Sequence, residues 1–174
     1  MGDSTATADT TRSTHTPTAG AYERLRILTA CKTIAMVGLS ADPMRPSHFA
    51  AIYMLAAGYN VIPVNPRYAG DTILGQTVYG ALGDIPADRQ VEIVDVFRKP
   101  ADVPPLVDEA VAIGAKVFWM QLGVINEEAA HKARASGLEV VMNRCVKIEH
   151  ARFFGGLNLV GMNTGVLTAR RGIG

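Results

Sequence analysis

The chain has 174 residues, enough for one domain with a full core, and 48% of them are hydrophobic although only 6% are aromatic. A formal net charge of +1 argues against nucleic acid or an anionic membrane surface as the main partner, and no apolar run approaches the roughly 20 residues that span a bilayer. The two cysteines, Cys31 and Cys145, form no CxxC pair. We therefore expect neither a disulfide scaffold nor a metal site, and a reducing cytoplasmic location.

The first 20 residues, MGDSTATADTTRSTHTPTAG, are rich in Thr, Ala and Ser and carry almost no large apolar side chain. Such a segment buries too little surface to offset the entropy of ordering it. It also lacks the apolar central stretch of a signal peptide. We therefore predict a disordered N-terminal tail over residues 1–20.

Helical and strand patterns alternate from residue 22 onward. Apolar, β-rich runs predict strands near 33–38, 60–65, 91–97, 116–121 and 138–142. Apolar residues at helical spacing predict a leading helix over 22–31, and helices after Pro46, after Pro104 or Pro105, and within 125–137. Pro63 is poorly suited to a central strand and indicates an edge or a bulge. Residues 66–76 read as a loop, and 77–86 as a short edge strand and a turn.

The alternation of helices with fully apolar strands predicts the fold class. Strands that are apolar on both faces are typical of a parallel sheet that is covered by helices on both sides. Right-handed crossovers then give an α/β fold with a doubly wound, mainly parallel sheet in a single domain over residues 21–150. Residues 151–174 do not continue the alternation and are assigned to a C-terminal extension.

Ligands of such sheets bind beyond the carboxyl ends of the strands, near the point where the strand order reverses. The loops expected there are 38–47, 65–71, 97–104, 121–126 and 143–149. The first of them leads into a helix, whose N-terminus attracts phosphate through unpaired N–H groups and the helix dipole. Gly38 allows close backbone approach, Ser40 and Ser47 offer hydroxyls, and Arg45 adds a positive charge. A tight turn with a capping serine is the alternative, because the G-x-G-x-x-G pattern is absent.

The second loop distinguishes between nucleotide ligands. An NAD site places Asp or Glu after the second strand to accept the ribose hydroxyls, whereas this sequence reads VNPRY, with Arg67. Arginine at this place suits an additional phosphate, as in NADP or in coenzyme A (CoA) with its 3′-phosphate. A solvated surface charge is the alternative interpretation of Arg67.

Several motifs, in this order along the chain, resemble one protein family. VGLSADPMRPS, GYNVIPVNPRYAGDTILGQ, IVDVFRKP, FWMQLGVINEEAAHKARASGL and VVMNRCVKIEH are similar to motifs of the small bacterial CoA-binding proteins. These in turn are similar to the nucleotide-binding domain of the succinyl-CoA synthetase α subunit. The resemblance covers residues 22–150 and implies a Rossmann-like, CoA-binding fold.

The resemblance also implies roles for matching residues. Ser40 and its loop neighbours would contact the CoA phosphates, and Arg67 stands one place from a phosphate-binding lysine of the synthetase. We count Asn65, in the same VNPRY motif, with these binding residues. Two further groups complete the expected site, the first bordering the adenine and the second approaching the pantetheine arm: Val96, Phe97 and Arg98; Met120, Gln121 and Leu122.

The sequence offers little for catalysis. His48 and His131 fall within predicted helices, and a Cys145–His150 pair near Glu149 is weighed against the commoner case of an inert buried cysteine. The synthetase acts through a phosphorylated histidine in a second domain, which this sequence lacks. We therefore expect a non-catalytic binding module for CoA or acyl-CoA, acting as a sensor or carrier with an unidentified protein partner or as a homo-oligomer. An NADP-dependent oxidoreductase, or another nucleotide-dependent enzyme, is the alternative.

Overall fold

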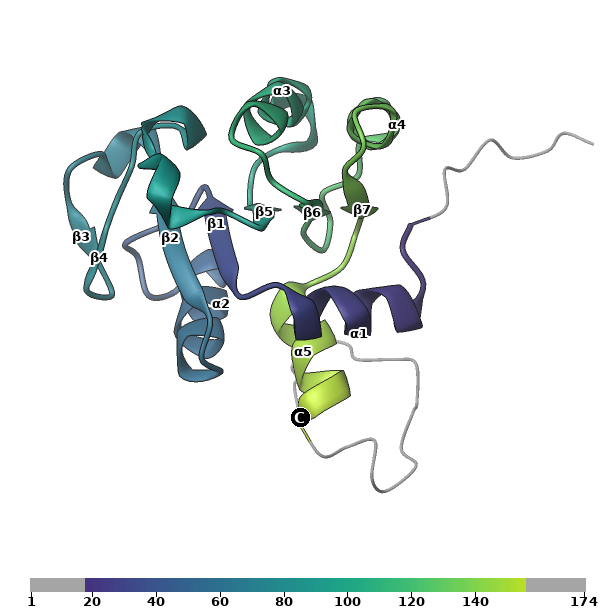
Figure 1. Ribbon diagram of the computed structural model, residues 1–174. Helices are drawn as coiled ribbons and strands as arrows, with labels where there is room; N and C mark the ends of the chain where they lie inside the picture. Colours follow the sequence, from purple (N-terminus) through teal and green to yellow (C-terminus); the bar gives the residue numbers. More distant parts are fainter. Residues whose placement is uncertain (1–17, 156–174) are drawn as a thin grey trace, which may run out of the picture.

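A five-stranded, wholly parallel sheet forms the centre of the protein (Figure 1). The structure is a computed structural model that describes residues 18–155. The strand order is β2-β1-β5-β6-β7. The strands are β1 (Thr33–Val37), β2 (Asn60–Val64), β5 (Ile93–Val96), β6 (Val117–Met120) and β7 (Glu139–Val141). The five predicted strands are therefore confirmed, each to within two residues at either end.

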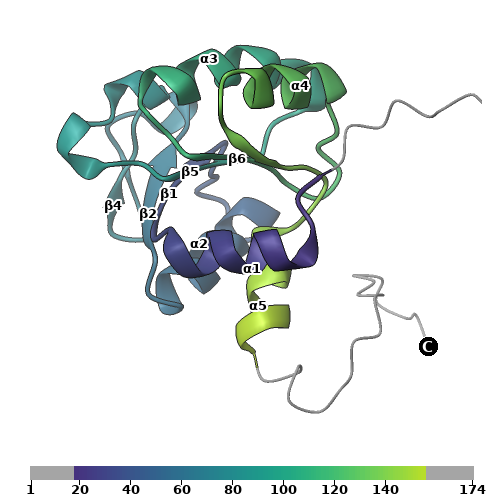
Figure 2. The same cartoon turned by 45° about the vertical axis from the view of Figure 1, so that its right-hand side comes forward.

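Helices cover both faces of the sheet, as Figures 1 and 2 show from two directions. One face carries α3 (Pro104–Ala112) and α4 (Glu127–Ala135), and the other carries α1 (Ala21–Ala30), α2 (Pro46–Ala56) and α5 (Val146–Phe154). The start of α4 is fixed by the side chain of Asn126, which accepts a hydrogen bond of 2.8 Å from the Ala129 N–H. The predicted α/β, doubly wound, single-domain architecture is confirmed.

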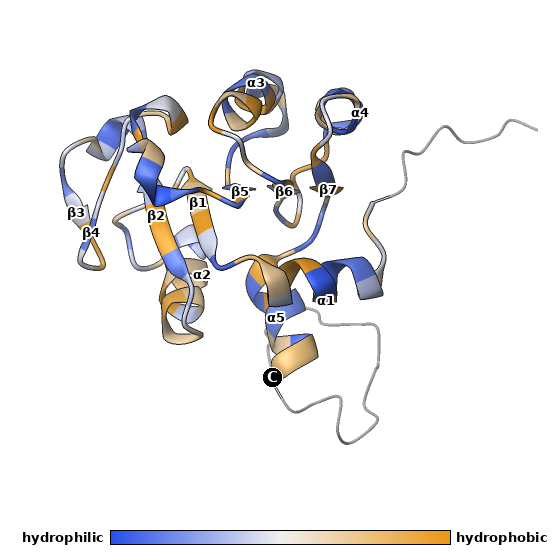
Figure 3. Ribbon diagram, viewed as in Figure 1, coloured by the Kyte–Doolittle hydropathy of each residue, from blue (hydrophilic) through white to orange (hydrophobic). Residues whose placement is uncertain are grey.

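Successive strand residues feed two separate cores, one on each face of the sheet. In β6, Phe118 and Met120 pack in the core under α3 and α4, while Val117 and Trp119 pack in the core against α1, α2 and α5. All four side chains are fully buried. Colouring by hydropathy shows β1 and β2 largely in the orange of hydrophobic residues and the helices in mixed colours (Figure 3). This two-sided burial explains why the strands read as continuous apolar runs.

Strand β2 lies at the edge of the sheet, as Pro63 indicated. The carbonyl of Pro63 accepts a hydrogen bond of 2.9 Å from the Tyr79 N–H on the outer side of the strand. Because the N–H and C=O of one residue point the same way in a strand, the missing N–H of proline also faces outward. A small hairpin of β3 (Thr72–Ile73) and β4 (Gln76–Thr77) occupies the end of the predicted loop 66–76 and the start of the segment 77–86, for which the sequence predicts a short edge strand.

Two predicted boundaries differ from the structure. The sequence assigns residues 18–20 to the tail, but Thr18 and Ala19 lie along β7 at the sheet edge, where the Ala19 N–H donates to the Val140 carbonyl at 3.2 Å, and Gly20 caps α1. Helix α5 crosses the predicted boundary at residue 150 and occupies half of the predicted loop 143–149. Its Glu149 forms a buried ion pair of 2.8 Å with Arg24 of α1, a long-range contact that no local pattern reveals. The remainder of the predicted tail and extension lies outside the described residues.

The strand order reverses between β1 and β5. From β1 the chain passes through α2 to β2 on one side, whereas from β5 it passes through α3 to β6 on the other side and the opposite face. The loops that follow β1 and β5 therefore diverge and open a crevice between them.

Gly38 is the residue that allows the chain to leave β1 at this point. Its φ is +89°, and a Cβ built on it would lie 2.4 Å from the carbonyl oxygen of Phe97, just beyond β5. The Gly38 N–H donates to the Val64 carbonyl at 2.7 Å, so the residue is held from the β2 side as well. A side chain is therefore excluded by both the backbone conformation and the space.

We predict that Gly38→Ala destabilises the fold by about 2–5 kcal/mol, because it combines left-handed strain with a steric clash. The matched control is Gly58→Ala, since Gly58 has φ +86° but open space around the same Cβ position. The control is expected to cost about 1–2 kcal/mol. Urea unfolding of both variants measures the difference, and equal losses would show that the approach to Phe97 is unimportant.

Candidate functional site

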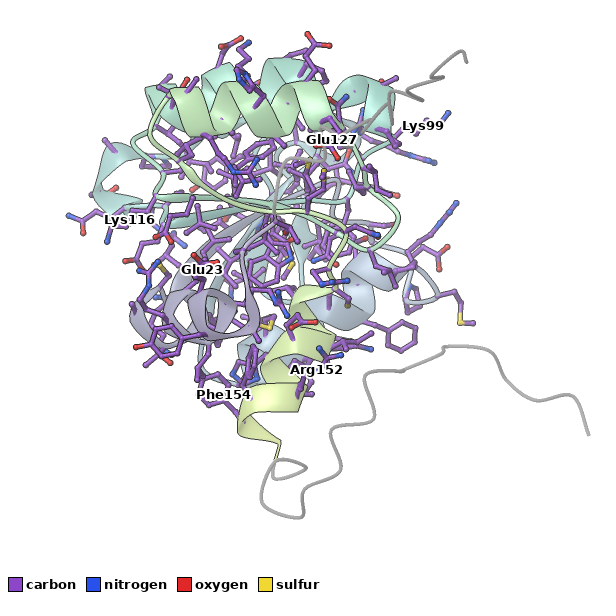
Figure 4. All side chains as sticks on the ribbon, turned by 90° about the vertical axis from the view of Figure 1, so that its right-hand side faces the viewer. Glu23, Lys99, Lys116, Glu127, Arg152 and Phe154 are labelled. Atoms are coloured by element: carbon purple, nitrogen blue, oxygen red, sulfur yellow. The ribbon has the colours of Figure 1, made fainter. Side chains whose placement is uncertain are left out.

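A cavity of about 540 Å³ opens at the carboxyl ends of β1, β2, β5 and β6. In Figure 4, Lys99 follows β5 on this side of the sheet, and Lys116, which precedes β6, marks the opposite side. The cavity thus includes the crevice between the β1 and β5 loops, where doubly wound folds bind ligands. Its lining residues are Gly38, Ser40, Arg45, Pro46, Ser47, Asn65, Pro66, Arg67, Tyr68, Phe97, Arg98, Gln121, Leu122 and Val124.

The structure brings ten of the twelve predicted site residues together around this cavity. They come from four of the five predicted loops, and the loop over 143–149 contributes none of the lining residues. The ten are Gly38, Ser40, Arg45, Ser47, Asn65, Arg67, Phe97, Arg98, Gln121 and Leu122. Four lining residues were missed: Pro46, Pro66, Tyr68 and Val124. The sequence could have predicted Tyr68 as a site residue, because it follows Arg67 in the VNPRY motif.

Two predicted site residues, Val96 and Met120, do not line the cavity. Both side chains are fully buried, and the two residues are register partners on adjacent strands β5 and β6. They point into the core under α3 and α4. The prediction placed the strand ends correctly but did not assign the face, and side chains alternate between faces along a strand.

Positive charge dominates the cavity. Arg45, Arg67 and Arg98 line it, and no Asp or Glu is among its lining residues. Arg45 and Arg98 each have an exposed acidic neighbour, Asp42 at 3.7 Å and Asp102 at 3.8 Å, and such exposed pairs are weak. The guanidinium of Arg67 lies 5.5 Å from the centre of the Tyr68 ring, and no carboxylate of the described residues pairs with it. The site therefore suits an anion.

The loop after β1 is organised around the first turn of α2. Pro46 is the first residue of this helix, and Ser47 is buried in the first turn. The Ser40 N–H donates to the Ser47 hydroxyl oxygen at 3.2 Å, and the Asp42 N–H donates to the Ser40 hydroxyl oxygen at 3.1 Å. Both hydroxyls thus accept backbone hydrogen bonds and keep their own hydrogen for another acceptor. A helix N-terminus with two hydroxyl donors is suited to phosphate.

The side-chain amide of Asn65 connects the loop after β1 to the loop after β2 through both its nitrogen and its oxygen. Its Nδ2 donates to the Leu39 carbonyl at 2.9 Å, and its Oδ1 accepts from the Arg67 N–H at 3.1 Å. The side chain is nearly buried. Asn65 therefore sets the position of Arg67 relative to the β1 loop.

A buried carboxyl lies beneath the cavity. Asp95 of β5 is fully buried, and its Oδ1 accepts a hydrogen bond of 2.7 Å from Nε2 of Gln121, which lines the cavity. The other carboxyl oxygen, Oδ2, has no hydrogen-bond partner. Desolvation by burial raises the pKa of Asp95 to about 8, against the smaller lowering effect of the Gln121 hydrogen bond. Asp95 is therefore mainly protonated, and neutral, at pH 7.

Among the described residues, no hydrogen bond or ring contact joins His150 to Cys145. His150 lies among Tyr53, Tyr59 and Phe154, and its Nδ1 is 3.1 Å from the Tyr53 hydroxyl. Burial raises the pKa of the Cys145 thiol, which opposes formation of a thiolate. In residues 18–155, no group of three or more His, Cys, Asp or Glu side chains is placed to hold a metal ion, and no helix is long and apolar enough to cross a membrane.

We predict that Asp95 makes the stability of the protein depend on pH. Its pKa is raised in the folded state, so its contribution is complete below the unfolded value of 3.8 and is lost as pH rises toward about 8. Within that range the contribution should fall by about 1.4 kcal/mol per pH unit. The measurement is the free energy of unfolding of wild type and Asp95→Asn between pH 5 and 8. Their difference isolates Asp95, and parallel curves would contradict the raised pKa.

Comparisons with known proteins find relatives that cover most of the chain. The chain is 42% identical over 125 residues to the uncharacterized protein YneT of Bacillus subtilis, covering 72% of this chain and 90% of that one. A hypothetical protein from Pyrococcus horikoshii has a similar solved structure, with a TM-score of 0.74 and 41% identity, covering 79% of this chain and 94% of that chain.

A larger enzyme contains a similar domain. The dinucleotide-forming acetyl-coenzyme A synthetase 1 of Ca. Korarchaeum cryptofilum, solved with phosphate and ADP, matches with a TM-score of 0.59 and 25% identity. The match covers 68% of this chain and 27% of the synthetase. Residues 32–151 match the family described as the CoA binding domain, a span that includes every residue lining the cavity. The chain belongs to the CoA binding domain family.

Proposed function

We propose that this protein binds coenzyme A or an acyl-CoA in the cavity at the carboxyl ends of β1, β2, β5 and β6, as a binding module without catalysis of its own. The observation that carries the proposal is the gathering of three arginines and the N-terminus of α2 around one cavity whose lining residues include no carboxylate. CoA carries a diphosphate and a separate 3′-phosphate, which matches two separate cationic positions. Membership of the CoA binding domain family supports the same ligand.

The geometry of the loops supports two separate phosphate positions. The diphosphate lies at the first turn of α2, against the hydroxyls of Ser40 and Ser47 and beside Arg45. The 3′-phosphate pairs with Arg67, whose guanidinium has no acidic partner within the described residues. Phe97 and Arg98 border the adenine, and the pantetheine arm runs toward Gln121 and Leu122.

NADP is the second candidate ligand. Its 2′-phosphate would also pair with Arg67, which stands where an NAD site carries an acidic residue. The absence of an assembled acid, base or nucleophile among the cavity-lining residues favours the binding module over the oxidoreductase. Both cysteines, Cys31 and Cys145, are free thiols, which supports the cytoplasmic location that we propose. In a sensor or carrier role, a protein partner or a second copy of the chain would recognise the protein with its ligand bound.

We predict that CoA and acetyl-CoA raise the melting temperature of the purified protein, whereas NAD does not. A ligand that binds only the folded state stabilises it by about 2.7 kcal/mol at a hundredfold excess over its Kd. The measurement is a thermal-shift series with CoA, acetyl-CoA, NAD and NADP at fixed salt. Stabilisation by NADP alone would select the alternative function.

We predict that Arg67→Ala weakens CoA binding by about tenfold to a hundredfold, because a charge-assisted hydrogen bond to phosphate contributes roughly 1.5–3 kcal/mol. Arg89→Ala is the matched control, since Arg89 is an exposed arginine outside the cavity lining, and it should leave the affinity unchanged. The fold should survive both changes, because each arginine is exposed.

Calorimetry with dephospho-CoA identifies the phosphate that Arg67 contacts. This ligand lacks the 3′-phosphate, so it should bind wild type weakly and lose little more in the Arg67→Ala variant. Equal losses for both ligands would move Arg67 to the diphosphate. No loss for either would return Arg67 to the solvated surface.

A further inference from the structure

The contact between Asp95 and Gln121 links a fully buried carboxyl to the wall of the cavity. Asp95 stands in the middle strand of the sheet, flanked in register by Met36 of β1 and Trp119 of β6. Gln121 follows β6 directly and is only 3% exposed, yet it lines the cavity. The two side chains meet through a single hydrogen bond of 2.7 Å. Burying an acid in the centre of a sheet costs free energy of folding, and this cost suggests that Asp95 has a role beyond packing.

We propose that Asp95 is a positioning residue for the ligand: it holds the side-chain amide of Gln121 so that the amide oxygen faces the cavity and accepts a hydrogen bond from an N–H or O–H of the pantetheine arm. The inference rests on the proposed function, because it assigns one part of CoA to one residue of the same cavity. It adds a buried residue that no ligand atom touches.

The hydrogen bonding of the pair supports this orientation. Asp95 accepts through Oδ1, so Nε2 of Gln121 is directed toward the core. In a neutral carboxylic acid, Oδ1 is then the carbonyl oxygen and the proton resides on Oδ2. One N–H of the Gln121 amide is used in this bond, and the amide oxygen, which can only accept, remains for the cavity. In the proposed arrangement the cavity wall thus offers an acceptor to a hydrogen-bond donor of the ligand at this point.

The chemistry of CoA provides such donors. The pantetheine arm is uncharged and carries two amide N–H groups and one hydroxyl, whereas the remainder of the molecule is anionic. The anionic part suits the arginines at the other lining positions, Arg45, Arg67 and Arg98. A neutral amide beside an apolar Leu122 suits the uncharged arm. The cavity is thus divided into a cationic part and a neutral part.

The test compares CoA with 3′,5′-ADP, which keeps the adenosine and its 3′-phosphate but lacks the pantetheine arm. Calorimetry is performed on wild type, Asp95→Leu, Gln121→Met, the double variant and the conservative Asp95→Asn. Each of the first two variants should weaken CoA binding by about tenfold, the effect of one hydrogen bond. The double variant should be no weaker than Gln121→Met, since Asp95 acts through Gln121. Asp95→Asn should retain CoA affinity, and 3′,5′-ADP should bind all five proteins equally.

Several outcomes would overturn the proposal. Equal weakening of CoA and 3′,5′-ADP by Asp95→Leu would mean that Asp95 acts only through the general structure. Additive losses in the double variant would mean that Asp95 does not act through Gln121. Unchanged CoA affinity in Gln121→Met would remove the contact itself. If Asp95→Leu does not fold, the double variant, which leaves neither partner unpaired, is compared with Gln121→Met, and a weaker double variant overturns the inference. If wild type binds no CoA at all, the proposed function fails first.

Discussion

The approach of Gly38 to the end of β5 is the constraint on which the site depends. A Cβ atom added to Gly38 would lie 2.4 Å from the carbonyl oxygen of Phe97, so only glycine lets the chain leave β1 along this path. This tight crossing lets the β1 loop turn toward α2 while the β5 chain turns toward α3 on the opposite face. The crevice between the two loops is the result, and the other lining residues are arranged around it.

Neutral polar side chains build the site, and arginines give it its charge. Three neutral side chains form hydrogen bonds of 2.9 to 3.2 Å with the backbone of the loop after β1: Asn65, Ser47 and His48. They are nearly buried, so these bonds are little weakened by water. Arg67, in contrast, is exposed at the cavity and held through its backbone by Asn65. This division keeps the cationic groups available while fixing where they stand.

On the face of the sheet that carries α1, α2 and α5, contacts between residues far apart in the sequence hold the elements in place. Arg24 of α1 pairs with Glu149 of α5 at 2.8 Å, and both side chains are almost fully buried. The Trp119 indole N–H donates to the Arg144 carbonyl at 2.7 Å, which fixes the chain between β7 and α5 to strand β6. Arg152 also pairs with Glu149, at 3.3 Å, so the buried carboxylate has a cation on each of its two oxygens, and the Arg24 pair links α1 to α5.

The sequence by itself determined the periodic parts of this protein. Two-sided apolar runs predicted the five parallel strands, Pro63 indicated the edge position of β2, and Gly38 and Arg67 identified the loops where a phosphate would bind. These signals are local, because strand burial, glycine freedom and charge each act through the residue that carries them. The order of the motifs along the chain identified the family.

Only the tertiary structure decided which face of the sheet each side chain points to and which side chains pair across the fold. Val96 and Met120 end the predicted strands as expected, yet they point into the core, because alternation along a strand assigns a face only once the sheet is packed. Helix α5 is fixed by Glu149 meeting Arg24, and the role of Asp95 emerges from its meeting with Gln121. Partners separated by 125 and 26 positions in the chain leave no local pattern. Only the folded sheet brings them within hydrogen-bond distance.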